Sequence, residues 1–325
     1  YPDMSADFIH LHVHSHLSLL NALPKIPELV GAAKKDGQTA LALTDDGNLY
    51  GAIEFYKACA KEGIKPIIGV DFFVAPRTRF DKEHRIDNRT SRLVLLAKNK
   101  KGYDNLIKLV TFSNTEGFYY RARIDQELIE QNNAGLIAIL PSFASSVSHA
   151  LRDDDTEKAM ERLNWYKKVF GKNLYLELTH HPEIPDHQEL QERIVELSET
   201  NDVPLVAAQD VYYMQHSDNL ARELARKIQN GTSLMGDEAD RPEDFSFITQ
   251  KTAKTYFKKY PEALTNTVKI AESCNVELEL GNWVFPNYPT DKGSNYDDML
   301  RKAAYAGIAT SHVRQVPAKL SWWVM

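Results

Sequence analysis

Short apolar runs rich in β-branched residues recur along the first two-thirds of the chain, and each is followed by an amphipathic segment. Runs of this kind predict strands, and apolar residues spaced three or four apart predict helices packed on a sheet. The expected strands are 8–14, 39–44, 65–74, 92–97, 135–140, 173–179 and 203–208. The expected helices lie near 26–35, 51–62, 103–115, 124–131, 154–169, 187–200 and 218–229.

This alternation of strand and helix predicts right-handed crossovers and a parallel sheet. Seven repeats without the glycine fingerprint of dinucleotide-binding folds favour a closed or nearly closed β/α barrel over an open doubly wound sheet. In such barrels the functional side chains collect where the strands end, at one shared mouth. Polar side chains of ligand type stand at most of these positions: His12, His14, Asp45, Asp46, Asp71, Arg92, Ser142, His180, His181 and Asp210.

His12 and His14 are the clearest chemical signal in the chain. Residues two apart on a strand point to the same face, so both imidazoles can be directed into one pocket, as a metal site requires. The alternative is a polar strand end with solvated histidines. Aspartate is common after strands because it forms turns, which explains residues 45–48 but not the two histidines.

The alternation stops after about residue 232. The segments expected beyond it are a loop at 241–249, helices at 251–260 and 261–274, and extended stretches at 276–280 and 283–288. We therefore expect a barrel domain at 1–234 and a small, mainly helical appendage or linker at 235–325. The last five residues, 321–325, match no helix-capping or turn pattern, which favours a piece of a longer protein.

The composition describes an ordinary globular protein with a real core, because 43% of its 325 residues are apolar and 26% are charged. No apolar run is long enough to span a bilayer and no signal peptide opens the chain, so a cytoplasmic protein without membrane contact is expected. Two cysteines, Cys59 and Cys274, exclude a disulfide framework. A net charge of −6 implies that contact with nucleic acid is local or provided by another chain.

The opening run 8–15 (FIHLHVHS) resembles the first motif of the PHP (polymerase and histidinol phosphatase) domain family. The blocks 40–56, 65–69, 95–106 and 261–276 narrow this resemblance to the N-terminal domain of bacterial replicative DNA polymerase III alpha subunits. The resemblance covers nearly the whole chain. It implies a distorted seven-stranded β/α barrel of the PHP type. It also implies that the polymerising parts follow this domain, so the chain should not polymerise DNA alone.

In active members of the PHP family, nine side chains hold up to three metal ions that activate water. Carried over by the resemblance, four of these positions keep good ligands, a set that can hold one zinc or manganese ion: His12, His14, Asp71 and Asp210. Asp46 stands in place of a histidine and is a weak ligand. The other four positions depart from the family pattern: Asn21, Arg92, Ser142 and Tyr212.

Arginine cannot coordinate a metal and carries a permanent positive charge. Our hypothesis is that Arg92 replaces a cation by pairing with Asp71 or Asp46, so that the pocket keeps its charge balance without further metals. A multi-metal phosphoesterase needs neighbouring ions, and this arrangement would lack them.

The resemblance thus implies a degenerate PHP domain that takes part in DNA replication, with a structural role and a docking role. Its expected partners are the rest of the alpha subunit and a separate proofreading exonuclease subunit, with DNA reached indirectly. One alternative is an active metal-dependent 3′–5′ exonuclease or phosphoesterase that uses the four retained ligands. A second, a stand-alone histidinol-phosphatase-like enzyme, is disfavoured by the 261–276 block. The parent protein would be a DNA-directed DNA polymerase, a nucleotidyltransferase; whether this chain is itself an enzyme stays open.

Two further features have alternative interpretations. His180 and His181 could reach the mouth or lie in a solvated loop, and the other histidines, His10 among them, are expected to be structural or exposed. The run 119–123 (YYRAR) mixes aromatic residues with arginines in a way that can stack on bases and bind phosphates. A capping or interface role is the alternative for this run.

Overall fold

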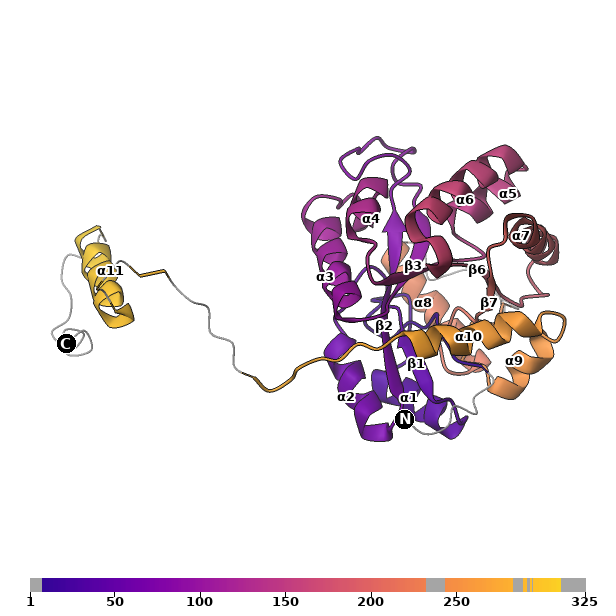
Figure 1. The fold of residues 1–325 in the computed structure, drawn as a ribbon, viewed down its shortest axis with the longest axis horizontal. Helices are drawn as coiled ribbons and strands as arrows, with labels where there is room; N and C mark the ends of the chain where they lie inside the picture. The colour runs from indigo at the N-terminus through magenta and orange to yellow at the C-terminus, as the bar shows by residue number, and fades with distance from the viewer. Residues whose placement is uncertain (1–7, 232–242, 283–288, 291–292, 294, 311–325) are drawn as a thin grey trace. The chain divides into compact units, whose positions relative to one another are not determined.

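The computed structural model describes residues 8–231, 243–282, 289–290, 293 and 295–310. The chain divides into two compact units, Tyr1–Leu278 and Glu279–Met325 (Figure 1). Among the described residues, the second unit contributes one helix, α11 (Tyr296–Thr310). The extended stretch expected at 283–288 and the chain end at 321–325 lie outside the described residues.

The first unit is built on a curled, mixed half-barrel sheet with helices packed around it (Figure 1). The strand order is β1-β2-β3-β5-β6-β7, and the short strand β4 pairs with β2. The strands are β1 (Ala40–Leu43), β2 (Lys65–Val74), β3 (Ser91–Ala97), β4 (Arg123–Ile124), β5 (Leu136–Leu140), β6 (Leu174–Leu178) and β7 (Leu205–Ala207). The predicted α/β class and the barrel-like curvature are confirmed.

Ten α-helices of the first unit have described bounds, and half of them begin at a side chain that caps the first turn. Asn99, Asp125, Ser145 and Asp155 each accept a hydrogen bond from the backbone three residues on. The helices are α1 (Ile26–Lys35), α2 (Ala52–Glu62), α3 (Lys100–Thr115), α4 (Gln126–Asn132), α5 (Ser146–Arg152), α6 (Thr156–Phe170), α7 (His187–Asn201), α8 (Asn219–Asn230), α9 (Gln250–Tyr256) and α10 (Pro261–Ser273).

The prediction of an all-parallel sheet is wrong, because β3 runs antiparallel to both β2 and β5. The connection from β2 to β3, residues 75–90, contains no helix, and without a helical crossover the chain returns antiparallel. Phe73, near the end of β2, is therefore paired with Arg92, near the start of β3. This reversal brings Arg92 to the edge where the parallel strands end.

The segment 8–14 is extended, but it forms only an isolated bridge, between Val13 and Val211, and not the predicted strand. On one side the Ala42 N–H donates to the His10 carbonyl oxygen at 2.9 Å. On the other side the His14 N–H donates to the Val211 carbonyl oxygen, also at 2.9 Å. The segment therefore lies between β1 and the chain that follows β7, and it links the two ends of the curled sheet.

Helices α9 and α10, which the sequence analysis places in the appendage, lie within the first compact unit. The Ile9 N–H donates to Thr267 Oγ1 at 3.0 Å, and Lys65 Nζ donates to the Ala271 carbonyl oxygen at 2.6 Å. These contacts tie α10 to the opening segment and to β2. The division into functional domains 1–234 and 235–325 stays a prediction.

His10 is a structural histidine, as expected. It is fully buried, its Nε2 donates to the Ile248 carbonyl oxygen at 2.9 Å, and its ring packs on Phe247 with a centroid separation of 4.2 Å. Burial lowers the pKa of His10 to about 4, against a usual value of 6.5, although the bond to Ile248 works in the opposite direction.

This lowered pKa predicts a loss of stability in mild acid. Between pH 6.5 and 4 the unfolded chain binds a proton at His10 that the folded chain excludes, so stability falls as the pH falls. We expect His10 to contribute a loss of about 2 kcal/mol in the free energy of unfolding between pH 7 and pH 5. Urea unfolding at both pH values checks this, with His10→Gln as the non-titrating comparison. Equal losses in the two proteins would contradict it.

Candidate metal centre

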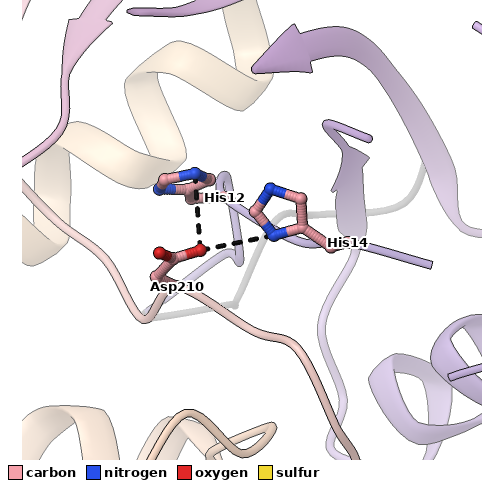
Figure 2. Close-up of side chains that lie close together, drawn as sticks. All are labelled: His12, His14 and Asp210. Carbon is pink, nitrogen blue, oxygen red and sulfur yellow. Dashed lines mark ion pairs between the residues drawn. The ribbon is translucent and has the colours of Figure 1, made fainter. Parts of the chain in front are cut away.

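His12, His14 and Asp210 point toward one another (Figure 2). Both imidazoles come from the extended segment 8–14, and Asp210 follows β7. Asp210 Oδ1 lies 3.5 Å from His12 Nε2 and 3.3 Å from His14 Nδ1. Because the two histidines are two residues apart on extended backbone, they share one face, as their spacing predicts.

A second group consists of His14, Asp46 and Asp71. His14 Nε2 lies 3.5 Å from Asp71 Oδ2 and 3.6 Å from Asp46 Oδ1. The two aspartates are brought together by an isolated parallel bridge between Asp46, which follows β1, and Asp71, which lies within β2. Asp71 Oδ2 also lies 3.2 Å from His12 Nε2, so the two groups are continuous. The structure thus brings together the four residues predicted to be good metal ligands, His12, His14, Asp71 and Asp210.

Arg92 occupies the second group. Its Nη2 contacts both Asp46 Oδ1 and Asp71 Oδ2, so the guanidinium pairs with both carboxylates named in the sequence-based hypothesis. Its flat face lies over the Phe73 ring, with Cζ 4.1 Å from the ring centre. Asn21, another departure from the family pattern, donates from Nδ2 to Asp46 Oδ2 at 2.7 Å. A cation and an amide donor therefore hold the carboxylates that would serve a second metal.

Glu177 orients His12 and was not foreseen from the sequence. Its Oε2 accepts a hydrogen bond from His12 Nδ1 at 2.7 Å, which turns Nε2 of that ring toward Asp210 and Asp71. Glu177 Oε1 accepts the Ser142 N–H at 3.0 Å. The Ser142 hydroxyl bonds to Thr179 Oγ1 at 2.7 Å, so this side chain lies beside the orienting residue. The sequence feature that points to Glu177 is its position as a charged residue inside the otherwise apolar strand Leu174–Leu178.

Tyr212, the remaining departure, packs against a ligand. Its ring is stacked on His14 with a centroid separation of 4.3 Å and an interplanar angle of 4°. The Arg222 guanidinium lies over the Tyr212 ring, with Cζ 3.7 Å from the ring centre. Tyr212 and Arg222 therefore fix the plane of the His14 imidazole.

His180 and His181 lie in neither ligand group. His181 Nδ1 lies 3.1 Å from Glu183 Oε1, and its ring packs near Phe245 with a centroid separation of 4.8 Å. The His180 ring lies 4.2 Å from that of Tyr256.

The charged groups of the cluster stabilise one another strongly. Burial acts against the charged form of His14, but the nearby carboxylates of Asp210, Asp71 and Asp46 outweigh it and raise its pKa to about 9. Burial alone would raise the pKa of Asp210, but the neighbouring imidazoles of His12 and His14 outweigh it and lower the pKa to about 2. The pKa of Asp71 is well below its usual range because the charge of Arg92 outweighs burial.

These shifts describe an ion-pair network in the metal-free chain. The pKa of His12 is raised well above its usual value, since the charges of Asp210 and Glu177 and a bond to Asp71 overcome burial. Near neutral pH, two imidazolium groups and the Arg92 guanidinium then face the carboxylates of Asp46, Asp71, Asp210 and Glu177. Replacing protons by a metal requires both histidines to become neutral, so metal affinity should rise with pH.

The donor set fits one metal ion better than two. The ligand atoms of each group lie within 4.8 Å of one another. In the group of His12, His14 and Asp210, the buried Asp210 Oδ1 has no hydrogen-bond partner among the described residues. Two imidazoles with carboxylates suit zinc or manganese. In the second group Arg92 already contacts both carboxylates, so of these two groups the one formed by His12, His14 and Asp210 is the better candidate to hold an ion.

Among the described residues, no helix combines the length and apolar character needed to cross a bilayer.

The chain is 40% identical to the DNA polymerase III subunit alpha of Borreliella burgdorferi over 285 residues, which are 86% of this chain and 25% of that protein. It is 35% identical to the DNA polymerase III subunit alpha of Aquifex aeolicus over 322 residues, 94% of this chain and 28% of that protein. The chain thus spans about a quarter of the length of these relatives.

Similarity to solved structures is lower. An amidohydrolase from Chromobacterium violaceum superposes with a TM-score of 0.44 and 15% identity, covering 63% of this chain and 87% of the other.

The PHP domain family model matches residues 10–181, more than half of the chain and the part that contains the opening histidines, β1, β2 and Arg92. The chain belongs to the PHP domain family.

Proposed function

We propose that the chain is the PHP domain of a cytoplasmic bacterial DNA polymerase III alpha subunit that takes part in DNA replication. Identities of 35–40% to such subunits over most of this chain support the proposal. Because the chain spans about a quarter of those proteins, polymerisation of DNA would belong to the remainder of the subunit.

The domain itself has a structural role built on a degenerate metal site. The observation that carries this proposal is the contact of one guanidinium, Arg92, with both Asp46 and Asp71. A hydrolytic cluster uses adjacent ions to generate hydroxide and to clamp the attacking and leaving oxygens. With a guanidinium in the second position, the site holds at most one divalent ion. The charge network instead joins the opening segment, β2, β3 and the chain after β7.

A zinc or manganese ion held by His12, His14 and Asp210 would act as a Lewis acid and lower the pKa of a bound water. The chain's own residues would then have defined tasks. Glu177 keeps the His12 Nδ1–H engaged so that Nε2 is free to coordinate, and Tyr212 fixes the ring plane of His14.

Such an ion would support the second candidate function, a metal-dependent 3′–5′ exonuclease or phosphoesterase that uses His12, His14, Asp71 and Asp210. Buried carboxylate oxygens without a hydrogen-bond partner among the described residues, Oδ1 of Asp71 and of Asp210, favour this alternative.

A trimming assay separates the two functions. The purified chain is incubated with 3′-labelled single-stranded DNA and manganese or zinc, beside Asp210→Asn. We expect no difference between the two proteins. Trimming by the wild type that Asp210→Asn lacks would favour the enzyme and contradict the degenerate site.

The proposed docking role has its own measurement. A proofreading exonuclease subunit from a bacterium whose alpha subunit resembles this chain should co-elute with it in gel filtration. Binding that persists in Asp210→Asn would show that docking does not need the metal centre. Absence of any complex at micromolar concentrations would contradict a docking role for this domain.

Glu177 should control the affinity of the single metal position. In Glu177→Gln the amide cannot accept with the same strength from His12 Nδ1–H, and its Nε2 becomes a poorer ligand. Loss of such an orienting carboxylate is expected to weaken zinc binding roughly 10- to 100-fold. Titration against a chelator measures this, with Glu183→Gln, at the carboxylate beside His181, as the matched control. Equal affinities in all three proteins would refute the assigned role.

A further inference from the structure

Arg121 lies in a tight turn that the fold holds in place. The Tyr119 N–H donates to the Arg121 carbonyl oxygen at 3.0 Å, and Tyr120 between them has a left-handed backbone with φ of +59°. Immediately after the turn, Arg123 is fully buried and bonded to backbone carbonyls. Gly117 before the turn lies so close to the Arg123 carbonyl that a Cβ would stand 2.0 Å from its oxygen. The turn is therefore fixed on both sides.

The Arg121 guanidinium forms no ion pair with a carboxylate of the described residues. It lies over Phe73, with Cζ 4.6 Å from the ring centre, and Arg92 lies over the same ring. Arg92 pairs with two carboxylates, whereas no carboxylate among the described residues pairs with Arg121. An arginine that is positioned by stacking and left unpaired is available for an external anion.

Arg121 lines an open cavity of about 420 Å³ beside the charged cluster. Asp46 and Phe73 form its inner side, and the end of α8 contributes Gln229. Two tyrosines at the same cavity, Tyr50 and Tyr120, are 70% and 66% exposed. The exposed aromatic rings provide faces on which bases can stack, and the neighbouring Arg121 guanidinium provides hydrogen-bond donors for a phosphate. Proteins bind single-stranded nucleic acids with this combination.

We propose that this cavity binds one nucleotide unit, with its phosphate on Arg121 and its base stacked on Tyr120. The cavity is large enough for a ligand of this size. The repulsion that Asp46 would exert on the phosphate is reduced because Arg92 and Asn21 already bind the two oxygens of that carboxylate. The inference goes beyond the proposed function, since binding here requires neither a metal nor hydrolysis.

The test measures binding to the 325-residue chain in EDTA, so that metal plays no part. A fluorescently labelled five-nucleotide oligothymidylate is titrated by anisotropy, and thymidine 5′-monophosphate, ribose 5-phosphate and inorganic phosphate compete. Arg121→Gln removes the charge, and Tyr120→Asn removes the ring with a residue that tolerates the left-handed backbone. Arg89→Gln, at an exposed arginine of a different cavity, is the matched control. Thermal melting shows that each variant is folded.

We expect Arg121→Gln to weaken binding at least tenfold and to reduce the slope of log K against log salt by about 0.7, the value for one phosphate contact on a single strand. Tyr120→Asn should weaken binding about tenfold without changing that slope. Arg89→Gln should bind as the wild type does. Competition by thymidine 5′-monophosphate supports a site for one free nucleotide, and binding of the oligomer alone supports a unit of a strand.

Three results would overturn the proposal: no binding by the wild type, unchanged affinity in Arg121→Gln, or ribose 5-phosphate competing as well as thymidine 5′-monophosphate. None of these results bears on how many metal ions the site holds, so this proposal and the proposed function can fail separately.

Discussion

Replacing Arg92 with methionine is expected to lower the free energy of unfolding of the metal-free chain by about 3–5 kcal/mol. This is the usual cost of removing one partner of a buried ion pair while the other stays buried. Methionine keeps most of the apolar contact with Phe73 but removes the positive charge. Asp46 and Asp71 are then buried next to each other without the cation between them. The same variant should regain stability when zinc or manganese is added, because a divalent ion can take the place of the guanidinium.

Urea unfolding in EDTA and in excess zinc measures both effects. Arg121→Met is the matched control, since Arg121 lies over the same ring but pairs with no carboxylate among the described residues. We expect only a small change in that control. If Arg92→Met were as stable as the wild type in EDTA, the guanidinium would not be balancing the charge of the two aspartates.

Arg123→Met is the second large effect, expected to cost about 3–5 kcal/mol because buried hydrogen-bond acceptors lose a charged donor. Arg123 Nε donates to the Gly117 carbonyl oxygen at 2.9 Å and Nη1 to that of Asp87 at 2.8 Å. Its Nη2 donates to the carbonyl oxygens of Arg79 and Asp81, at 2.9 and 3.0 Å. One side chain thus holds the β2–β3 connection and the turn before β4.

The measurement for Arg123 combines urea unfolding with limited trypsin digestion. The variant should be cleaved early within 77–89, where the connection has lost its anchor. Arg123→Lys should recover only part of the stability, because the lysine ammonium lacks the planar guanidinium and cannot donate to all four carbonyl oxygens. A variant that unfolds at the wild-type urea concentration and resists trypsin would contradict the assigned role.

The course of the chain could largely be predicted from hydrophobic patterning. The strand predicted at 65–74 matches β2 residue for residue, and the helix predicted at 26–35 matches α1. The direction of β3 could not be predicted, because strand periodicity is the same in both directions and only the absence of a helix between 75 and 90 distinguishes them. The strand β4 has only two residues and no periodicity to detect.

The site could be predicted in part. The spacing of His12 and His14 fixes their common direction, and the family pattern supplied Asp71 and Asp210. The contact of Arg92 with both carboxylates depends on the reversal of β3, which patterning does not reveal. Glu177 was missed because its role arises from a contact with His12, 165 residues away in the chain, and no local motif encodes such a contact.

Whether Arg92 fills the second metal position is decided by the number of metal ions bound per chain, determined by elemental analysis after dialysis against zinc or manganese. We expect at most one ion in the wild type and an additional ion in Arg92→His, where an imidazole replaces the guanidinium between Asp46 and Asp71. Two or more tightly bound ions in the wild type would contradict it.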